Sequence, residues 1–219
     1  MKTGARILWT SLLAVFLITC CPIKTQADTV ALSFTDAGGF AASPNYTFGW
    51  AFTLSNTVTL TELGVWDRSG TGLNDSHLVT LWTSTGTQAA QTTIPSGTSA
   101  PITDGFRYES ITPVVLSAGS YTIGAFFTSS SDTAATLCST VTTAAGVTYD
   151  GSKATGGNGF PSFDSAGYGN GYFGPNFQFT TEAVPEPSTW AVGLLTAGLL
   201  LCSIWRRRAG WVRREIHNC

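Results

Sequence analysis

The chain has 219 residues, of which 43% are hydrophobic and only 11% are charged. Between Asp28 and Thr189 three basic residues stand against twelve acidic ones, so this stretch has no basic surface and we expect no nucleic-acid partner. The other basic residues flank two apolar segments near the ends of the chain, on the side that the positive-inside rule places in the cytoplasm. The acidic middle is therefore expected on the far side of a membrane.

Residues 1–27 have the layout of a secretory signal peptide. Two basic residues precede an apolar run over 7–21, and Ala27 offers a small side chain at the expected cleavage position. We therefore expect the mature chain to start at residue 28. Lipidation of Cys20 is an alternative, because the four residues that end at Cys20 are similar to a lipobox, although Thr19 fits that pattern poorly.

Residues 28–181 are long enough for one domain with a sizeable core, and their composition is typical of an all-β fold. Thr, Ser, Gly and aromatic residues dominate, whereas helix-forming charged residues are few. Residues 46–54 alternate strictly, so Phe48, Trp50 and Phe52 share one face, which we predict to be buried. These features predict an antiparallel β-sandwich of jelly-roll type.

Turn-forming residues divide the rest of this domain into further segments. Strands are expected over 58–66, 77–83, 106–112, 120–128 and 176–179. We expect the last of these to pair near the N-terminal end of the domain, which would bring both ends of the domain together. The strand pattern weakens after residue 129, and residues 129–143 are small and polar. Residues 150–174 are rich in glycine and are predicted as a loop that aromatic residues such as Phe160 and Phe163 hold to the surface.

Cys138 is the one cysteine between residues 28 and 181, because the other four lie in the two apolar segments and the terminal tail. The exported domain therefore has no internal disulfide and must be stabilised by its core. A lone cysteine is more often a buried structural thiol than a nucleophile, and we expect the structural role for Cys138.

No constellation of residues in the sequence predicts catalysis, and we expect neither an enzyme nor a cofactor. Asp75, Ser76 and His77 are the residue types of a hydrolytic triad, but neighbours on an extended chain point to alternate sides. We expect His77 to bond to a turn or a backbone group instead. Glu62 and Glu109 would form a glycosidase pair only if the fold placed them about 5–10 Å apart in a cleft.

Metal and glycan binding rest on weaker signals. The sequence predicts no metal site; the alternative is one Ca²⁺ held by the glycine-rich stretch, where 156–159 is similar to a Gly-Gly-x-Gly-x-Asp repeat that lacks its aspartate. Trp50 is predicted to lie in the core. Trp82 is also predicted to be buried, by packing against the facing sheet. The aromatic side chains expected to contact a glycan are Trp66, Tyr168 and Tyr172.

The C-terminal tail has three parts. Residues 182–189 form a proline-rich linker, which the two prolines keep extended and accessible. Residues 190–205 carry no charge and would rise about 24 Å as a helix, a short transmembrane anchor with Trp at each end. Residues 206–219 form a basic cytoplasmic tail that begins with the membrane stop Arg206, Arg207 and Arg208. A buried core helix is the alternative, but core helices seldom end in three arginines.

This tail resembles the PEP-CTERM sorting signal of exported bacterial proteins. The matching parts are the string Val184, Pro185, Glu186, Pro187, Ser188 and Thr189, the apolar segment and the arginine cluster, in that order. The resemblance implies that an exosortase recognises the Pro-Glu-Pro region of a membrane-anchored precursor and removes the anchor, often in organisms that make exopolysaccharide. Such tails normally stop soon after the arginines, whereas this chain continues to Cys219.

The domain itself resembles an exported module of unassigned function that is common in PEP-CTERM proteins, through stretches that include 46–53, 63–67, 76–82, 116–124 and 172–177. The resemblance implies a β-sandwich without an assigned active site. The sequence thus predicts a structural or adhesive protein of the cell surface or extracellular matrix. Exopolysaccharide binding is the alternative function, and glycoside hydrolysis is a distant one.

Overall fold

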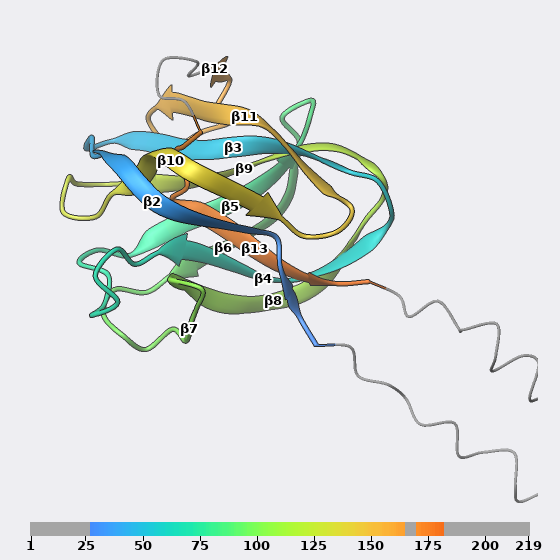
Figure 1. The fold of residues 1–219 in the computed structure, drawn as a ribbon, viewed down its shortest axis with the longest axis horizontal. Coiled ribbons are helices and arrows are strands. Elements are labelled where there is room, and N and C mark those ends of the chain that lie inside the picture. Colours follow the sequence, from blue (N-terminus) through green and yellow to red (C-terminus); the bar gives the residue numbers. More distant parts are fainter. Residues whose placement is uncertain (1–26, 165–169, 182–219) are drawn as a thin grey trace, which may run out of the picture. The chain divides into compact units, whose positions relative to one another are not determined.

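The computed structural model describes residues 27–164 and 170–181. The signal peptide up to residue 26, Tyr168, the sorting motif, the expected transmembrane helix and the arginine stop lie outside the described residues. Within the described ranges every regular element is a β-strand and all strand pairs are antiparallel (Figure 1). A search of these ranges for a helix long and apolar enough to cross a membrane finds none.

The strands form two large sheets and a ribbon. The six-stranded sheet has the order β12-β11-β3-β9-β5-β6, with β3 (Tyr46–Leu54), β5 (His77–Thr83), β6 (Gln88–Ile94), β9 (Gly119–Phe127), β11 (Val147–Gly156) and β12 (Phe163–Asp164). The five-stranded sheet has the order β1-β13-β4-β8-β7, with β1 (Thr29–Val30), β4 (Val58–Trp66), β7 (Ile102–Thr103), β8 (Phe106–Leu116) and β13 (Pro175–Thr180). The ribbon pairs β2 (Leu32–Ala41) with β10 (Ala134–Thr143).

The two large sheets meet at an aromatic core, in a sandwich-like arrangement (Figure 1). The predicted alternation of β3 is confirmed, because Phe48, Trp50 and Phe52 are all buried. Trp50 stacks on Phe177 of the opposite sheet with ring centroids 5.9 Å apart, and its indole N–H donates to the Pro175 carbonyl at 2.9 Å. The inward face of β3 therefore holds the two sheets together by packing and by a hydrogen bond.

The six predicted strands are confirmed, but the loop expected over 150–174 is wrong for residues 150–156. β11 is a ten-residue strand whose last seven residues lie within that stretch, and β10 is a ten-residue strand within 129–143, where no strand was predicted. β2 and β6 were not predicted either. β10 and β11 bury small residues, Ala134, Ala135 and Ala154 among them. Small inward side chains produce no strong hydrophobic alternation, which explains why the pattern missed these strands.

The two ends of the domain lie together, as the sequence predicted. β1 pairs with β13, and Thr29 lies opposite Phe179. At this end of the five-stranded sheet Thr59 pairs with Thr180, whereas Trp66 at the other end of β4 pairs with Phe106. The nine residues of β4 span about 3.3 Å each, so the loops after Trp66 lie at the pole opposite the two ends of the domain.

Gly49 and Gly124 lie opposite each other on β3 and β9, where the backbones leave no room for a side chain. A Cβ on Gly49 would lie 1.9 Å from the carbonyl oxygen of Ile123, whereas a Cβ on the loop residue Gly159 would meet nothing within 4 Å.

We predict that Gly49→Ala lowers the free energy of unfolding by about 1–3 kcal/mol through overpacking. Gly159→Ala should change it by less than about 0.5 kcal/mol. Urea denaturation of the processed protein measures both, and equal stabilities would contradict this packing.

Candidate functional site

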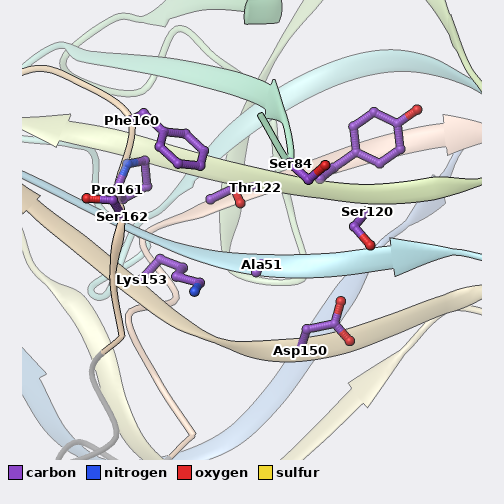
Figure 2. A pocket seen from close by; sticks show the side chains of 10 residues that line it. Ala51, Ser84, Ser120, Thr122, Asp150, Lys153, Phe160, Pro161 and Ser162 are labelled. Carbon is purple, nitrogen blue, oxygen red and sulfur yellow. The ribbon is translucent and has the colours of Figure 1, made fainter. Parts of the chain in front are cut away.

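The outer face of the six-stranded sheet carries an open trough of about 250 Å³ (Figure 2). β3 contributes Ala51, β9 contributes Ser120 and Thr122, and β11 contributes Asp150 and Lys153. Ser84, which follows β5, and the segment 160–162 between β11 and β12 complete the lining. The trough thus gathers side chains from five separate parts of the chain.

The floor of the trough follows from the alternation that builds the core. Because Trp50 and Phe52 point inward, Ala51 between them points outward, and it pairs with Thr122 on β9. On its other side Ala51 pairs with Gly151 of β11. Small outward residues on three adjacent strands leave this face hollow.

One wall of the trough is the segment around Phe160, which covers Trp82. The two rings meet edge to face with centroids 5.9 Å apart, and Trp82 is only 8% exposed. Trp82 pairs with Thr122 and so points to the outer face of the sheet. The prediction that Trp82 is buried is confirmed. The predicted partner is wrong, because the segment around Phe160 covers Trp82 on the outer face and the facing sheet does not.

Hydrogen bonds fasten this wall to the sheet. The Thr47 hydroxyl donates to the Gly157 carbonyl at 2.7 Å, and the Gly157 N–H donates to the Asn45 carbonyl at 2.8 Å. The prediction that aromatic residues hold this segment to the surface is confirmed for Phe160, whereas Phe163 is 63% exposed. The wall is therefore already in place before any ligand binds.

The charged groups of the trough lie on β11, and hydroxyl groups from neighbouring strands surround them. The Thr53 hydroxyl donates to Oδ2 of Asp150 at 2.7 Å, and Thr53 also bonds to Ser120 across the strands at 3.1 Å. Lys153 forms an ion pair with Asp164 of β12. A carboxylate, an ammonium group and several hydroxyls thus surround an apolar floor, an arrangement that suits a ligand with both hydroxyl groups and apolar faces.

At the pole opposite the ends of the domain, a buried ion pair organises the loop after β4. Arg107 is 3% exposed, and its Nε donates to Oδ2 of Asp67 at 2.8 Å. The guanidinium also donates to the carbonyls of Ala100 at 2.8 Å and Gly70 at 3.1 Å. Burial raises the pKa of Asp67, but hydrogen bonds from Gly72 and Arg107 outweigh it and hold that pKa below its ordinary value.

A second buried pair joins this loop to the segment after β9. His77 is 1% exposed; its Nδ1 lies 3.1 Å from the Phe126 carbonyl and its Nε2 lies 2.9 Å from Oδ2 of Asp132. The expectation that His77 bonds to a backbone group is thereby confirmed. Asp132 also accepts the backbone N–H groups of Asn74 and Asp75. Burial raises the pKa of Asp132, but these hydrogen bonds, that of His77 foremost, outweigh it and hold the pKa well below its ordinary value.

Between the two pairs lies a smaller pocket of about 130 Å³, which Trp66 lines together with both carboxylates. Each oxygen of Asp67 and of Asp132 already accepts two hydrogen bonds. These carboxylates therefore have no capacity left for a cation. Within residues 27–164 and 170–181 no group of three His, Cys, Asp or Glu residues could hold a metal ion.

The residues predicted to contact a glycan are not brought together in the trough. Trp66 is partly buried and packs against Phe34 and Phe40 with ring centroids 5.4 and 6.0 Å away. The prediction for Tyr172 is wrong, because its side chain is 5% exposed and packs on Phe48 in the core. Tyr168 lies outside the described residues. Ala27 is exposed at the start of the described chain, and cleavage after it stays a prediction.

Glu62 and Glu109 do not form a glycosidase pair. Glu62 pairs with Ser110, whose hydroxyl donates to it at 2.9 Å, whereas Glu109 pairs with the buried Leu63. Residues that pair across two strands share a face, and neighbours along a strand alternate. The two carboxylates therefore project from opposite faces of the five-stranded sheet.

Asp150, Lys153 and Phe160 are the trough residues that the sequence reasoning missed. They lie in or beside β11, within a stretch that was predicted as a loop. The available signal was the pair of charged residues at 150 and 153 within a run of threonines and small residues. Because β11 was not predicted as a strand, the sequence did not show that these side chains lie next to the outward face of β3.

Comparison with known proteins identifies one part of the chain. The family model described as the PEP-CTERM protein-sorting motif matches residues 183–208. No curated protein and no solved structure matches the chain. The chain therefore carries a PEP-CTERM sorting motif at the position that the sequence predicted, which supports an exported protein processed by an exosortase from a membrane-anchored precursor.

We predict that Asp132→Asn lowers the free energy of unfolding by about 3 kcal/mol at pH 7, because it removes a buried carboxylate that accepts hydrogen bonds from the backbone N–H groups of Asn74 and Asp75 and lies 2.9 Å from Nε2 of His77. The pKa of Asp132 is lowered in the folded state, so its contribution is present above the unfolded pKa of about 3.9 and is lost as the pH falls below that value. The difference between wild type and variant should shrink on acidification. Denaturation at several pH values measures it, with the exposed Asp104→Asn as the control. A difference that stays constant below pH 4 would contradict this role.

Cys138 is 4% exposed, and burial raises the pKa of its thiol to about 11. Because the thiolate is the reactive form, we predict slow alkylation of the folded, processed protein by iodoacetamide at pH 8. Denaturant should make the reaction complete within minutes. Mass spectrometry follows the added group, and rapid alkylation of the folded protein would show that Cys138 is not a buried structural thiol.

Proposed function

We propose that the mature protein is a structural or adhesive component of the cell surface or extracellular matrix, which an exosortase releases from a membrane-anchored precursor. The observation that carries this proposal is the sorting motif at 183–208, which follows shortly after the last strand of a complete β-domain. A sorting motif determines delivery, so the domain before it is what is delivered. The signal peptide at residues 1–27 and the anchor at 190–205 belong to the same proposal.

Two properties of the domain support a structural role. The aromatic core closes without a disulfide in the described residues, where Cys138 is a free thiol. Three of the four edges of the large sheets end in two-residue strands, β1, β7 and β12. Short edge strands limit edge-to-edge pairing between molecules. The three short edge strands therefore limit association of molecules through these edges of the large sheets.

Carbohydrate binding is the second candidate function, and the trough on the six-stranded sheet favours it. The trough combines an aromatic wall at Phe160 with the carboxylate of Asp150 and several hydroxyls. Binding of exopolysaccharide would be one way for the domain to adhere to a matrix. Glycoside hydrolysis through Glu62 and Glu109 gains no support, since these carboxylates lie on opposite faces of a sheet.

We predict that the mature protein in its native host ends within Val184–Thr189 and fractionates with the surface or the medium. Replacing Pro185 and Pro187 with alanine should leave the intact precursor in the inner membrane, because the extended, accessible backbone that the enzyme reads is lost. The matched control is Pro113→Ala, at an exposed position of β8. Cell fractionation and the mass of the C-terminal peptide give the result. A wild-type chain that keeps residues 190–219 at the surface would contradict the proposal.

A further inference from the structure

We infer that the trough binds a neutral sugar residue of a glycan chain, with the Phe160 ring as its apolar platform and Asp150 as an acceptor for its hydroxyl groups. This inference rests on the second candidate function above and assigns to it a site and a ligand class. It differs from the sequence-based expectation, which placed glycan contacts at Trp66, Tyr168 and Tyr172.

The shape of the trough fits one sugar ring within a longer chain. Its volume of about 250 Å³ lies below the roughly 300–1,000 Å³ of clefts that enclose whole drug-sized ligands. The trough opens along the sheet surface, with Phe160 and Pro161 on one side and Asp150 and Lys153 along β11 (Figure 2). An open hollow of this kind lets a polymer enter and leave the site at both ends.

The platform is held rigidly in position. The Phe160 ring packs edge to face on Trp82, and the turn at Gly86 lies beside it, where a Cβ would meet the ring at an ordinary contact distance of 3.6 Å. Pro161 is buried beside Phe160 and packs toward Gly124 of β9. A fixed aromatic ring offers large apolar contact at a small entropic cost, and the C–H face of a sugar ring is a suitable partner for it.

The polar groups of the trough suit a polyhydroxylated ligand. Asp150 is exposed, and the hydrogen bond from Thr53 uses its Oδ2 atom. Its Oδ1 atom accepts no hydrogen bond from the described residues. The hydroxyls of Ser84, Ser120 and Ser162 each donate and accept. A carboxylate oxygen flanked by hydroxyls can bind several hydroxyl groups of one sugar ring at once.

The charges around the trough favour a neutral sugar over an acidic one. Lys153 is paired with Asp164, so the Asp150 carboxylate is the charge that is left uncompensated among the described lining residues. An acidic sugar would bring a second carboxylate toward Asp150, and like charges at short range repel. The acidic surplus of the exported domain acts in the same direction.

The test is binding of the processed protein to immobilised neutral polysaccharides, namely dextran, mannan and a β-glucan, with the polyuronate alginate as the acidic probe. We expect binding to at least one neutral polymer and none to alginate. Phe160→Ala and Asp150→Asn should each weaken that binding by about tenfold or more. Phe163→Ala is the matched control, because Phe163 lies three residues from Phe160, is 63% exposed and does not line the trough. Thermal denaturation confirms that each variant is folded, and Asp150→Asn keeps an acceptor for Thr53.

The outcomes separate this inference from the functions on which it depends. If wild type binds a neutral polymer but Phe160→Ala and Asp150→Asn bind equally well, carbohydrate binding stands and the assignment to the trough is overturned. Binding to alginate alone overturns the neutral ligand class. If wild type binds none of the four polymers, the inference is overturned, while the surface location is judged separately by the C-terminal mass of the processed protein.

Discussion

Trp50 connects the two large sheets at the centre of the molecule, through a ring stack on Phe177 and a hydrogen bond from its indole to the Pro175 carbonyl. β3 and β13 are interior strands of their sheets, so this contact helps to fix how the sheets face each other. It also sets the inward positions of β3, and Ala51 must then point outward to form the floor of the trough. By positioning β13, the same contact keeps the C-terminal end of the domain next to β1, where the sorting tail begins.

Two buried carboxylates and their partners organise the pole opposite the ends of the domain. Arg107 and Asp67 hold the loop after β4, and Asp132 with His77 joins that loop to the segment after β9. Buried ion pairs often contribute little net stability, but removing one partner leaves an unpaired charge and is costly. These pairs therefore fix the loop conformation in a domain that has no described disulfide. Because the carboxylate oxygens of Asp67 and Asp132 are saturated with hydrogen bonds, these pairs act as structural clamps.

The sequence predicted the features that have strong local signals. The bulky alternation of β3 predicted its buried face, and the proline string and arginine cluster predicted the sorting motif that the family model matches. β10 and β11 were missed because their inward residues are small, and the trough was missed with them, since Asp150 and Lys153 lie on β11. The burial of Tyr172 depends on contact with Phe48, more than a hundred residues earlier in the chain. Contacts between such distant positions leave no trace in local periodicity.

The central claim is that residues 28–181 are a self-contained β-domain that is carried across the inner membrane. An alkaline phosphatase reporter fused after Thr181 tests it most directly, because this enzyme needs disulfides that form only outside the cytoplasm. The account predicts an active reporter in the native host, and an inactive one when residues 1–27 are deleted. An inactive, cytosolic reporter on the chain with its N-terminus intact would contradict the account.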